Sequence, residues 1–197
     1  MIASPLKWHG GKSYLAKRIV EWAGISHGEA RVLEPSAGVG RFVWPLLEAG
    51  ALVTAVELDD RMVSAMSDEA TRRHVPNSTL LVKRRDFLSM DPEPHDLAVM
   101  NPPYEDGQAE VHVMRALEWA PRVVALVPLA FLCSLNRYEA VWRHVRLMRQ
   151  VNFIRRPSFG GDQGGSRDFA VFELVRRSKP REPGEKDRVE VEWWEPD

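Results

Sequence analysis

The chain has 197 residues, of which 44% are hydrophobic and 28% are charged, and its formal net charge at pH 7 is −1. This length and composition predict a globular protein with one well-formed core. The near-zero net charge argues against a surface that is positively charged all over and binds polyanions in general. The longest apolar run, near residues 123–132, is interrupted by Pro128, so no membrane partner and no membrane-spanning segment are expected.

The sequence also limits the expected location and metal content of the protein. The N-terminal stretch MIASPLKWHGGKS lacks the apolar core of a secretory signal, which predicts a cytoplasmic protein. Cys133 is the only cysteine, so neither an intramolecular disulfide nor a cysteine metal cluster can form. The six histidines are scattered without ligand spacing, and no metal site is expected.

Short apolar runs typical of buried parallel strands alternate with amphipathic stretches in the first two thirds of the chain. The expected strands are residues 31–35, 51–58, 79–86, 96–101 and 123–128. The expected helices between them are residues 41–48, 60–74 and 108–119. This alternation predicts a single α/β domain with a doubly wound, mostly parallel sheet, in which ligands bind at the carboxyl ends of the strands.

The last third of the chain continues the pattern less regularly. We expect a helix over residues 135–148 and strands over 150–154 and 168–175, with a glycine-containing loop at 155–168. The domain is expected to end at residue 177. Residues 178–197 would form a charged, proline-containing tail, although the alternation in VEVEWW (189–194) could add an edge strand.

The first two strand ends carry the pattern of a nucleoside site. The first ends in EPSAGVG (34–40), and the second ends at Glu57, nineteen residues after Gly38. Glycines allow close approach of the backbone to a ligand, and an acid at the next strand end can accept both hydroxyls of a ribose. Val43 occupies the third position of the dinucleotide fingerprint, which favours a nucleoside without a pyrophosphate. WHGGKS (8–13) is not a phosphate-binding loop, because Leu6 stands where that pattern needs glycine.

The third strand ends in Asp86 and Phe87. The carboxylate could accept the amino group of an adenine while the ring stacks beside it. The alternative interpretation is a turn residue followed by a core side chain.

The fourth strand ends in the sequence Asn101-Pro-Pro-Tyr104. An aryl amino group is a poor nucleophile because its lone pair is spread into the ring. The side-chain oxygen of Asn101 and the carbonyl oxygen of Pro102 could accept its two hydrogens and draw the nitrogen toward tetrahedral geometry in the transition state. Tyr104 could stack on the flat ring, while Pro103 would stiffen the segment against the substrate.

These motifs resemble those of the S-adenosylmethionine-dependent amino-methyltransferases. Asn-Pro-Pro-Tyr carries most of the resemblance, and PLKWHGGKSYLA further resembles the opening motif of Dam-like DNA adenine methyltransferases (the D12 class). The resemblance implies a Rossmann-like class I methyltransferase fold, S-adenosylmethionine as cofactor, and DNA as the nucleic-acid partner. Only fourteen residues separate Asp86 from Asn101, so the sizeable target-recognition insertion of Dam-like enzymes is absent. Sequence specificity would be relaxed, or supplied by loops or by a partner protein.

The resemblance also implies roles for individual residues. Cofactor-binding residues would be Trp8, Lys12, Glu34, Pro35, Gly38, Gly40, Glu57, Leu58, Asp86, Phe87 and Asn101. Asn101, Pro102 and Tyr104 would be catalytic, and Pro103 and Tyr104 would contact the substrate.

Three functions are compatible with the sequence. The first is methylation of the N6 amino group of adenine in DNA, in a setting such as restriction–modification. The second is the same chemistry on an adenine or guanine amino group of RNA, or on a protein glutamine, because each target is a planar amide or aryl amine. The third is a non-catalytic partner subunit, which the intact Asn101 and Tyr104 argue against.

The loop at 155–168 is expected to bind the nucleic-acid backbone. It follows a late strand, contains glycines for close approach, and carries Arg155, Arg156 and Arg167. The alternative is a surface loop whose arginines are only solvated.

Overall fold

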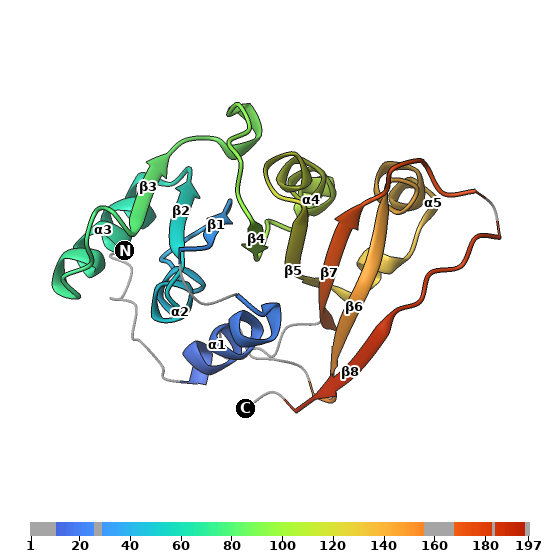
Figure 1. Cartoon of the computed structure of the whole chain (residues 1–197), viewed down its shortest axis with the longest axis horizontal. Coiled ribbons are helices and arrows are strands. Elements are labelled where there is room, and N and C mark those ends of the chain that lie inside the picture. The colour runs from blue at the N-terminus through green and yellow to red at the C-terminus, as the bar shows by residue number, and fades with distance from the viewer. Residues whose placement is uncertain (1–10, 26–28, 156–167, 183, 196–197) are drawn as a thin grey trace, which may run out of the picture.

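The computed structural model describes residues 11–25, 29–155, 168–182 and 184–195. One sheet of eight strands organises them, in the order β3-β2-β1-β4-β5-β7-β6-β8 (Figure 1). The strands are β1 (Arg31–Glu34), β2 (Leu52–Glu57), β3 (Leu80–Arg84), β4 (Leu97–Met100), β5 (Arg122–Pro128), β6 (Val145–Phe153), β7 (Phe169–Arg176) and β8 (Glu190–Trp194). The α-helices are α1 (Gly11–Ala23), α2 (Val43–Glu48), α3 (Asp60–Arg72), α4 (Gln108–Trp119) and the single turn α5 (Leu135–Arg137).

The sheet is mostly parallel, as the sequence predicts. Strands β3, β2, β1, β4 and β5 run in one direction. Strand β7 lies antiparallel between β5 and β6, and β8 pairs with β6 in parallel at the outer edge. The five parallel strands and β6 therefore end, and β7 begins, at one common edge of the sheet.

Helices cover both faces of the sheet. The core on one face is made by α1, α2 and Met66 of α3, and the core on the other face is made by α4 and the turns around Phe131 and Trp142. Figure 1 shows how these helices lie against the sheet. Asp59 begins α3 by accepting a hydrogen bond from the backbone N–H of Arg61. No helix among the described residues is long and apolar enough to cross a membrane.

The prediction of a helix over residues 135–148 is wrong beyond Trp142. A turn of α5 is followed by a π-helical turn at Tyr138–Trp142, and β6 already begins at Val145. Val145 and Leu147 are buried whereas Arg146 lies on the solvent side, which is the period of a strand. A register shift after Leu147 masks this alternation in the sequence.

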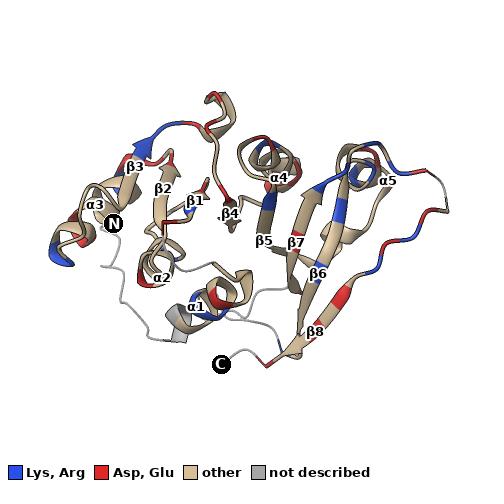
Figure 2. Cartoon of the chain, viewed as in Figure 1, with Lys and Arg blue, Asp and Glu red and all other residues tan. Residues whose placement is uncertain are grey.

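The segment leading to β8 is held by ion pairs. Asp187 is 8% exposed and contacts the guanidinium groups of Arg177 and Arg181, with Arg146 at 3.8 Å. Figure 2 shows positively charged residues, in blue, on β6 and at the end of β7. Arg146, Arg177 and Arg181 therefore hold the segment that precedes β8, which keeps β8 on the sheet.

Candidate active site

The carboxyl ends of β1 and β4 meet at the point where the strand order reverses. Strand β1 pairs with β2 on one side and with β4 on the other, so the chain builds outward from this point in both directions (Figure 1). In open α/β sheets this is where ligands bind. Glu34 ends β1 and Asn101 directly follows β4, so the fold brings the two main predicted motifs together.

Glu57 is hydrogen-bonded to the glycine loop that follows β1. Its carboxylate accepts hydrogen bonds from the backbone N–H of Gly38 at 2.7 Å, of Leu58 at 2.7 Å and of Asp59 at 2.8 Å. Two carboxylate oxygens offer about four acceptor positions, so one remains for a ligand hydroxyl. The acid thus joins the second strand end to the glycine loop.

The two predicted glycines both have left-handed backbone conformations. Gly38 has a φ of 55° and Gly40 a φ of 83°. A Cβ on Gly40 would also lie 3.1 Å from the ring of Trp44, which is itself 4% exposed. The loop therefore needs glycine at position 40 for its backbone conformation and for the close packing of Trp44.

Glu34 is a buried carboxylate with an unpartnered oxygen. The residue is 1% exposed, and its Oε2 atom has no hydrogen-bond partner among the described residues. Burial raises the pKa of Glu34 well above its ordinary value, the backbone N–H groups of Phe42 and Val43 oppose this, and the charge of Glu57 adds to it. Ser36 Oγ is also buried and likewise lacks a hydrogen-bond partner in the part of the chain that the structure describes. Buried oxygens without a hydrogen-bond partner, next to the glycine loop, indicate a binding position for a cationic or hydrogen-bond-donating group of a ligand.

The structure separates the two residues at the end of β3. Asp86 is exposed, and its side chain accepts a hydrogen bond from the backbone N–H of Leu88 at 3.0 Å. Phe87 is 3% exposed, and its ring packs on His112 and Trp119, with centroids 5.9 and 5.4 Å away. The prediction that Phe87 stacks on an adenine is therefore wrong, because its ring belongs to the core.

Tyr104 lies differently from the arrangement expected for catalysis. Its hydroxyl donates a hydrogen bond to Asn101 Oδ1 and lies 3.2 Å from the carbonyl oxygen of Leu126. Its ring packs on Phe169 with the centroids 5.4 Å apart. Burial raises the pKa of the Tyr104 hydroxyl, so this group stays a donor at physiological pH. The ring of Tyr104 is thus folded onto the protein, and its hydroxyl covers the oxygen that was expected to accept a substrate amine.

The structure describes some of the remaining predicted site residues and leaves out others. Pro102 is buried and Pro103 exposed, as expected for a rigid segment that leaves the sheet. Leu58 is 67% exposed beside Glu57. Arg155 is exposed and forms an ion pair with Glu195 at 3.1 Å. Trp8, Arg156, Arg167 and the side chain of Lys12 lie outside the described residues.

Phe169 is a site residue that the sequence analysis missed. It begins β7, which runs antiparallel to β5 with Phe169 opposite Pro128. The rule that sites lie at the carboxyl ends of parallel strands does not apply to the start of an antiparallel strand. The usable signal was an aromatic residue at the first position of a strand that directly follows the glycine-containing loop.

Comparison with known proteins gives relatives that act on ribosomal RNA. No known protein-family model matches the chain. A ribosomal RNA small subunit methyltransferase of Arabidopsis thaliana is 37% identical over 185 residues, which are 86% of this chain and 49% of that protein. Ribosomal RNA small subunit methyltransferase A of Mycobacterium avium is 36% identical over 96 residues, which are 45% of this chain and 29% of that protein. The chain thus spans half or less of the length of these relatives.

Solved methyltransferase structures share the fold at low sequence identity. The 23S rRNA methyltransferase ErmE is 23% identical, with a TM-score of 0.62, over 85% of this chain and 69% of that protein. A dimethyladenosine transferase of Plasmodium falciparum is 19% identical, with a TM-score of 0.60, over 82% and 61%. Magnesium protoporphyrin IX methyltransferase of Synechocystis, solved with bound S-adenosylmethionine, is 17% identical, with a TM-score of 0.61, over 85% and 80%. The chain has the Rossmann-like fold of class I methyltransferases, which confirms the predicted fold class.

These comparisons correct the predicted substrate. The prediction of DNA as the nucleic-acid partner is wrong, because the relatives with sequence similarity are ribosomal RNA methyltransferases. The predictions of DNA adenine methylation and of a restriction–modification setting are wrong for the same reason. RNA, which the sequence analysis kept as an alternative, agrees with the relatives.

Proposed function

We propose that this protein transfers a methyl group from S-adenosylmethionine to the N6 amino group of an adenine in RNA. The observation that carries the proposal is the position of Asn101 and Pro102 at the end of β4, next to the glycine loop after β1. The fold of S-adenosylmethionine-dependent enzymes and the ribosomal RNA methyltransferases among the relatives support the cofactor and the class of substrate.

The residues at the ends of β1 and β2 fit this cofactor. Its methionine part carries an ammonium group, and the unpartnered Oε2 of Glu34 offers a buried acceptor for it. The glycine loop gives the backbone close access, and the remaining acceptor position of Glu57 suits a ribose hydroxyl. The exposed Leu58 would cover one face of the adenine.

Asp86 would complete the cofactor site at the end of β3. One of its oxygens already caps the following turn through Leu88, and the carboxylate keeps further acceptor positions for the adenine amino group. When bound, the cofactor supplies a methyl group on a positively charged sulfur.

Asn101 and Pro102 would activate the target amine. The Oδ1 atom of Asn101 and the carbonyl oxygen of Pro102 accept its two hydrogens, so that the nitrogen lone pair leaves the ring and points at the methyl carbon. The bound cofactor would supply the methyl group to this nitrogen and would keep the electron pair of the carbon–sulfur bond on its sulfur, and the nitrogen would lose one proton to solvent. Asn101 needs no change of charge in this reaction.

Tyr104 must give up its hydrogen bond before the base can bind. Its hydroxyl occupies Asn101 Oδ1 in the free protein, so the amine has to displace it. A ring that turns away from Phe169 would then be free to stack on the flipped base.

The proposal is tested by the substrate class that accepts the methyl group. Tritium-labelled S-adenosylmethionine is incubated with the protein and, in parallel, with small-subunit ribosomal RNA, duplex DNA and cell protein. We expect label in RNA alone. Label that enters DNA or protein but not RNA would contradict the proposal.

A further inference from the structure

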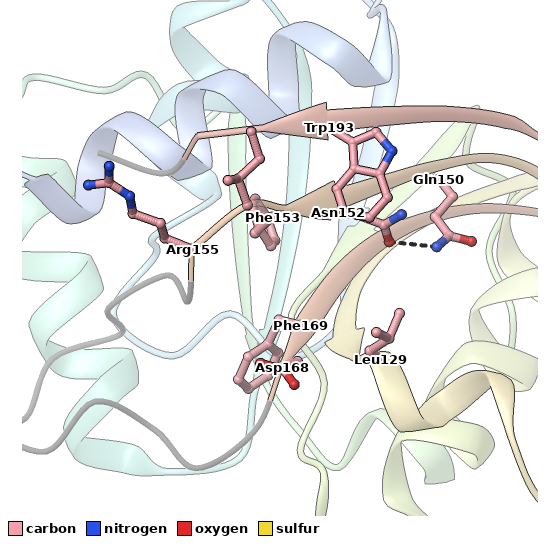
Figure 3. Close-up of a pocket in the computed structure, with 9 residues that line it drawn as sticks. Leu129, Gln150, Asn152, Phe153, Arg155, Asp168, Phe169 and Trp193 are labelled. Atoms are coloured by element: carbon pink, nitrogen blue, oxygen red, sulfur yellow. Dashed lines mark hydrogen bonds between the residues drawn. The ribbon is translucent and has the colours of Figure 1, made fainter.

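A pocket of about 440 Å³ lies beside the candidate active site, at the same edge of the sheet (Figure 3). It is lined by the end of β6, the start of β7 and the outer strand β8, together with Leu129 after β5. This volume suits a small ligand of the size of a nucleobase. Of the residues that line it, only Phe169 has a part in the function proposed above, as the packing partner of Tyr104.

Phe169 connects the pocket to the active site. Its ring packs on Tyr104 at 5.4 Å, and the same residue lines the pocket. A strand of RNA with one base at Asn101 would therefore have its adjoining nucleotide close to the pocket.

Trp193 offers an aromatic surface at this pocket. It is 66% exposed although it is a tryptophan on a sheet strand. Its neighbour Trp194 is 6% exposed and packs edge-on against Trp22, with centroids 6.1 Å apart. Trp194 therefore anchors the strand, and Trp193 is not needed for that. An exposed aromatic ring beside a nucleic-acid site is the usual platform on which a base stacks.

Two amides stand beside this ring. Parallel pairing places Asn152 opposite Trp193, so both side chains lie on one face of the sheet. Gln150 Nε2 donates a hydrogen bond to Asn152 Oδ1 at 2.6 Å, as Figure 3 shows. Within the described part of the chain, this bond leaves the other amide oxygen and the other amide NH₂ for a ligand. An acceptor and a donor side by side match the polar edge of a base.

The cationic side chain at the rim is turned out of the pocket, which favours a base over a phosphate inside it. The guanidinium of Arg155 points away from the other lining side chains and pairs with Glu195 (Figure 3). Both partners of this pair are well exposed, so a phosphate outside the pocket can replace Glu195 at small cost.

We propose that this pocket binds the base next to the target adenine in a single-stranded segment of RNA. Trp193 stacks on that base, and Gln150 and Asn152 contact its edge. The inference rests on the function proposed above and adds to it a determinant of sequence preference in the outer strand β8.

The test uses RNA in which the neighbouring base is absent. Fluorescent oligoribonucleotides carry one adenine at their centre, and the nucleotide on either side has guanine, cytosine, uracil or an abasic ribose. Binding is measured by anisotropy in the presence of S-adenosylhomocysteine. We expect removal of the base on one side to weaken binding to the wild-type protein about tenfold.

Variants assign this effect to the pocket. Trp193→Ala should bind the intact RNA as weakly as the wild-type protein binds the abasic RNA, and should no longer distinguish the two. Trp193→Phe should restore most of the difference, because stacking needs only a ring. Leu81→Ala is the matched control, since Leu81 is 50% exposed on β3 at the far edge of the sheet.

Two results would overturn the inference while leaving the proposed function intact. The wild-type protein could bind and methylate RNA equally well with and without the neighbouring bases, or Trp193→Ala could keep the full difference. A wild-type protein that neither binds nor methylates any RNA would instead overturn the proposed function. Thermal unfolding of each variant shows whether its fold is intact.

Discussion

The hydroxyl of Tyr104 donates a hydrogen bond to the side-chain oxygen of Asn101, and the ring of Tyr104 packs on Phe169. The first and last residues of the Asn-Pro-Pro-Tyr motif are therefore hydrogen-bonded to each other in the free protein. A half-buried acceptor gains stability from a partner, so this contact stabilises the site until a substrate amine replaces the hydroxyl. Substrate binding then includes the cost of breaking the contact.

Tyr104→Phe should bind RNA more tightly than the wild-type protein. The variant keeps the ring for stacking and leaves Oδ1 of Asn101 open to the amine. A hydrogen bond of this kind contributes about 1 kcal/mol net, so we expect the KM for RNA to fall about threefold to fivefold with kcat nearly unchanged. Tyr104→Ala should raise KM, because the stacking surface is lost. Steady-state kinetics would contradict the account if Phe and Ala had the same effect.

Asn101→Ala should abolish transfer while cofactor binding survives. Loss of one oriented transition-state acceptor typically lowers the rate by about 10²–10³. The expected result is a kcat reduced by this factor and an affinity for S-adenosylhomocysteine within about twofold of wild type. Single-turnover kinetics and calorimetry measure the two quantities, and a variant with near-normal turnover would exclude Asn101 as a catalytic residue.

Glu34 should make cofactor affinity depend on pH. Burial raises the pKa of its carboxyl, so below that raised pKa the group carries a proton that must leave before Oε2 can accept the ammonium group. We expect affinity for S-adenosylhomocysteine to rise as the pH rises through this raised pKa, and proton release on binding to be largest below it. Calorimetry in two buffers with different ionisation enthalpies measures both.

Glu34→Gln is the control for this pH dependence. The amide does not titrate, so the variant should bind more weakly at pH 7 and show a flat profile. A wild-type affinity that is the same across the range, or a slope that the Gln variant retains, would remove Glu34 from the cofactor site.

Gly40→Ala should destabilise the loop more than Gly50→Ala. Both glycines have a left-handed backbone, with φ of 83° and 85°, so both variants carry a strain of about 1–2 kcal/mol. Only at Gly40 would the added Cβ meet a buried ring, that of Trp44 at 3.1 Å. Denaturant unfolding should therefore show a further loss of about 1 kcal/mol or more for Gly40→Ala, which is a typical cost of overpacking. Equal losses in the two variants would mean that Trp44 can move aside.

The parallel half of the sheet could be predicted from the sequence, because β1, β2, β4 and β5 are buried on both faces and read as short continuous apolar runs. The start of β6 could not, since the irregularity near Met148 hides the alternation of Val145 and Leu147. The glycine loop could be placed from spacing alone. Its link to Glu57 follows from the strand register that brings the ends of β1 and β2 together.

Side-chain orientation was the harder part of the site to predict. The sequence places Phe87 and Tyr104 at strand ends but does not show whether a ring faces the ligand or the core. Phe87 turns inward because His112 and Trp119 offer it a packing surface. Tyr104 turns onto Phe169, a residue of an antiparallel strand far away in the sequence. Contacts of this kind depend on tertiary structure and leave no local pattern.

The identity of the methylated nucleoside tests the central claim most directly. Small-subunit ribosomal RNA is treated with the protein and S-adenosylmethionine, digested to nucleosides and analysed by mass spectrometry, with Asn101→Ala as the inactive control. The account predicts adenosine methylated at N6, formed by the wild-type protein and lost in the variant. Methylation of guanosine, or of a ring nitrogen or a ribose, in place of the adenine N6 would contradict it.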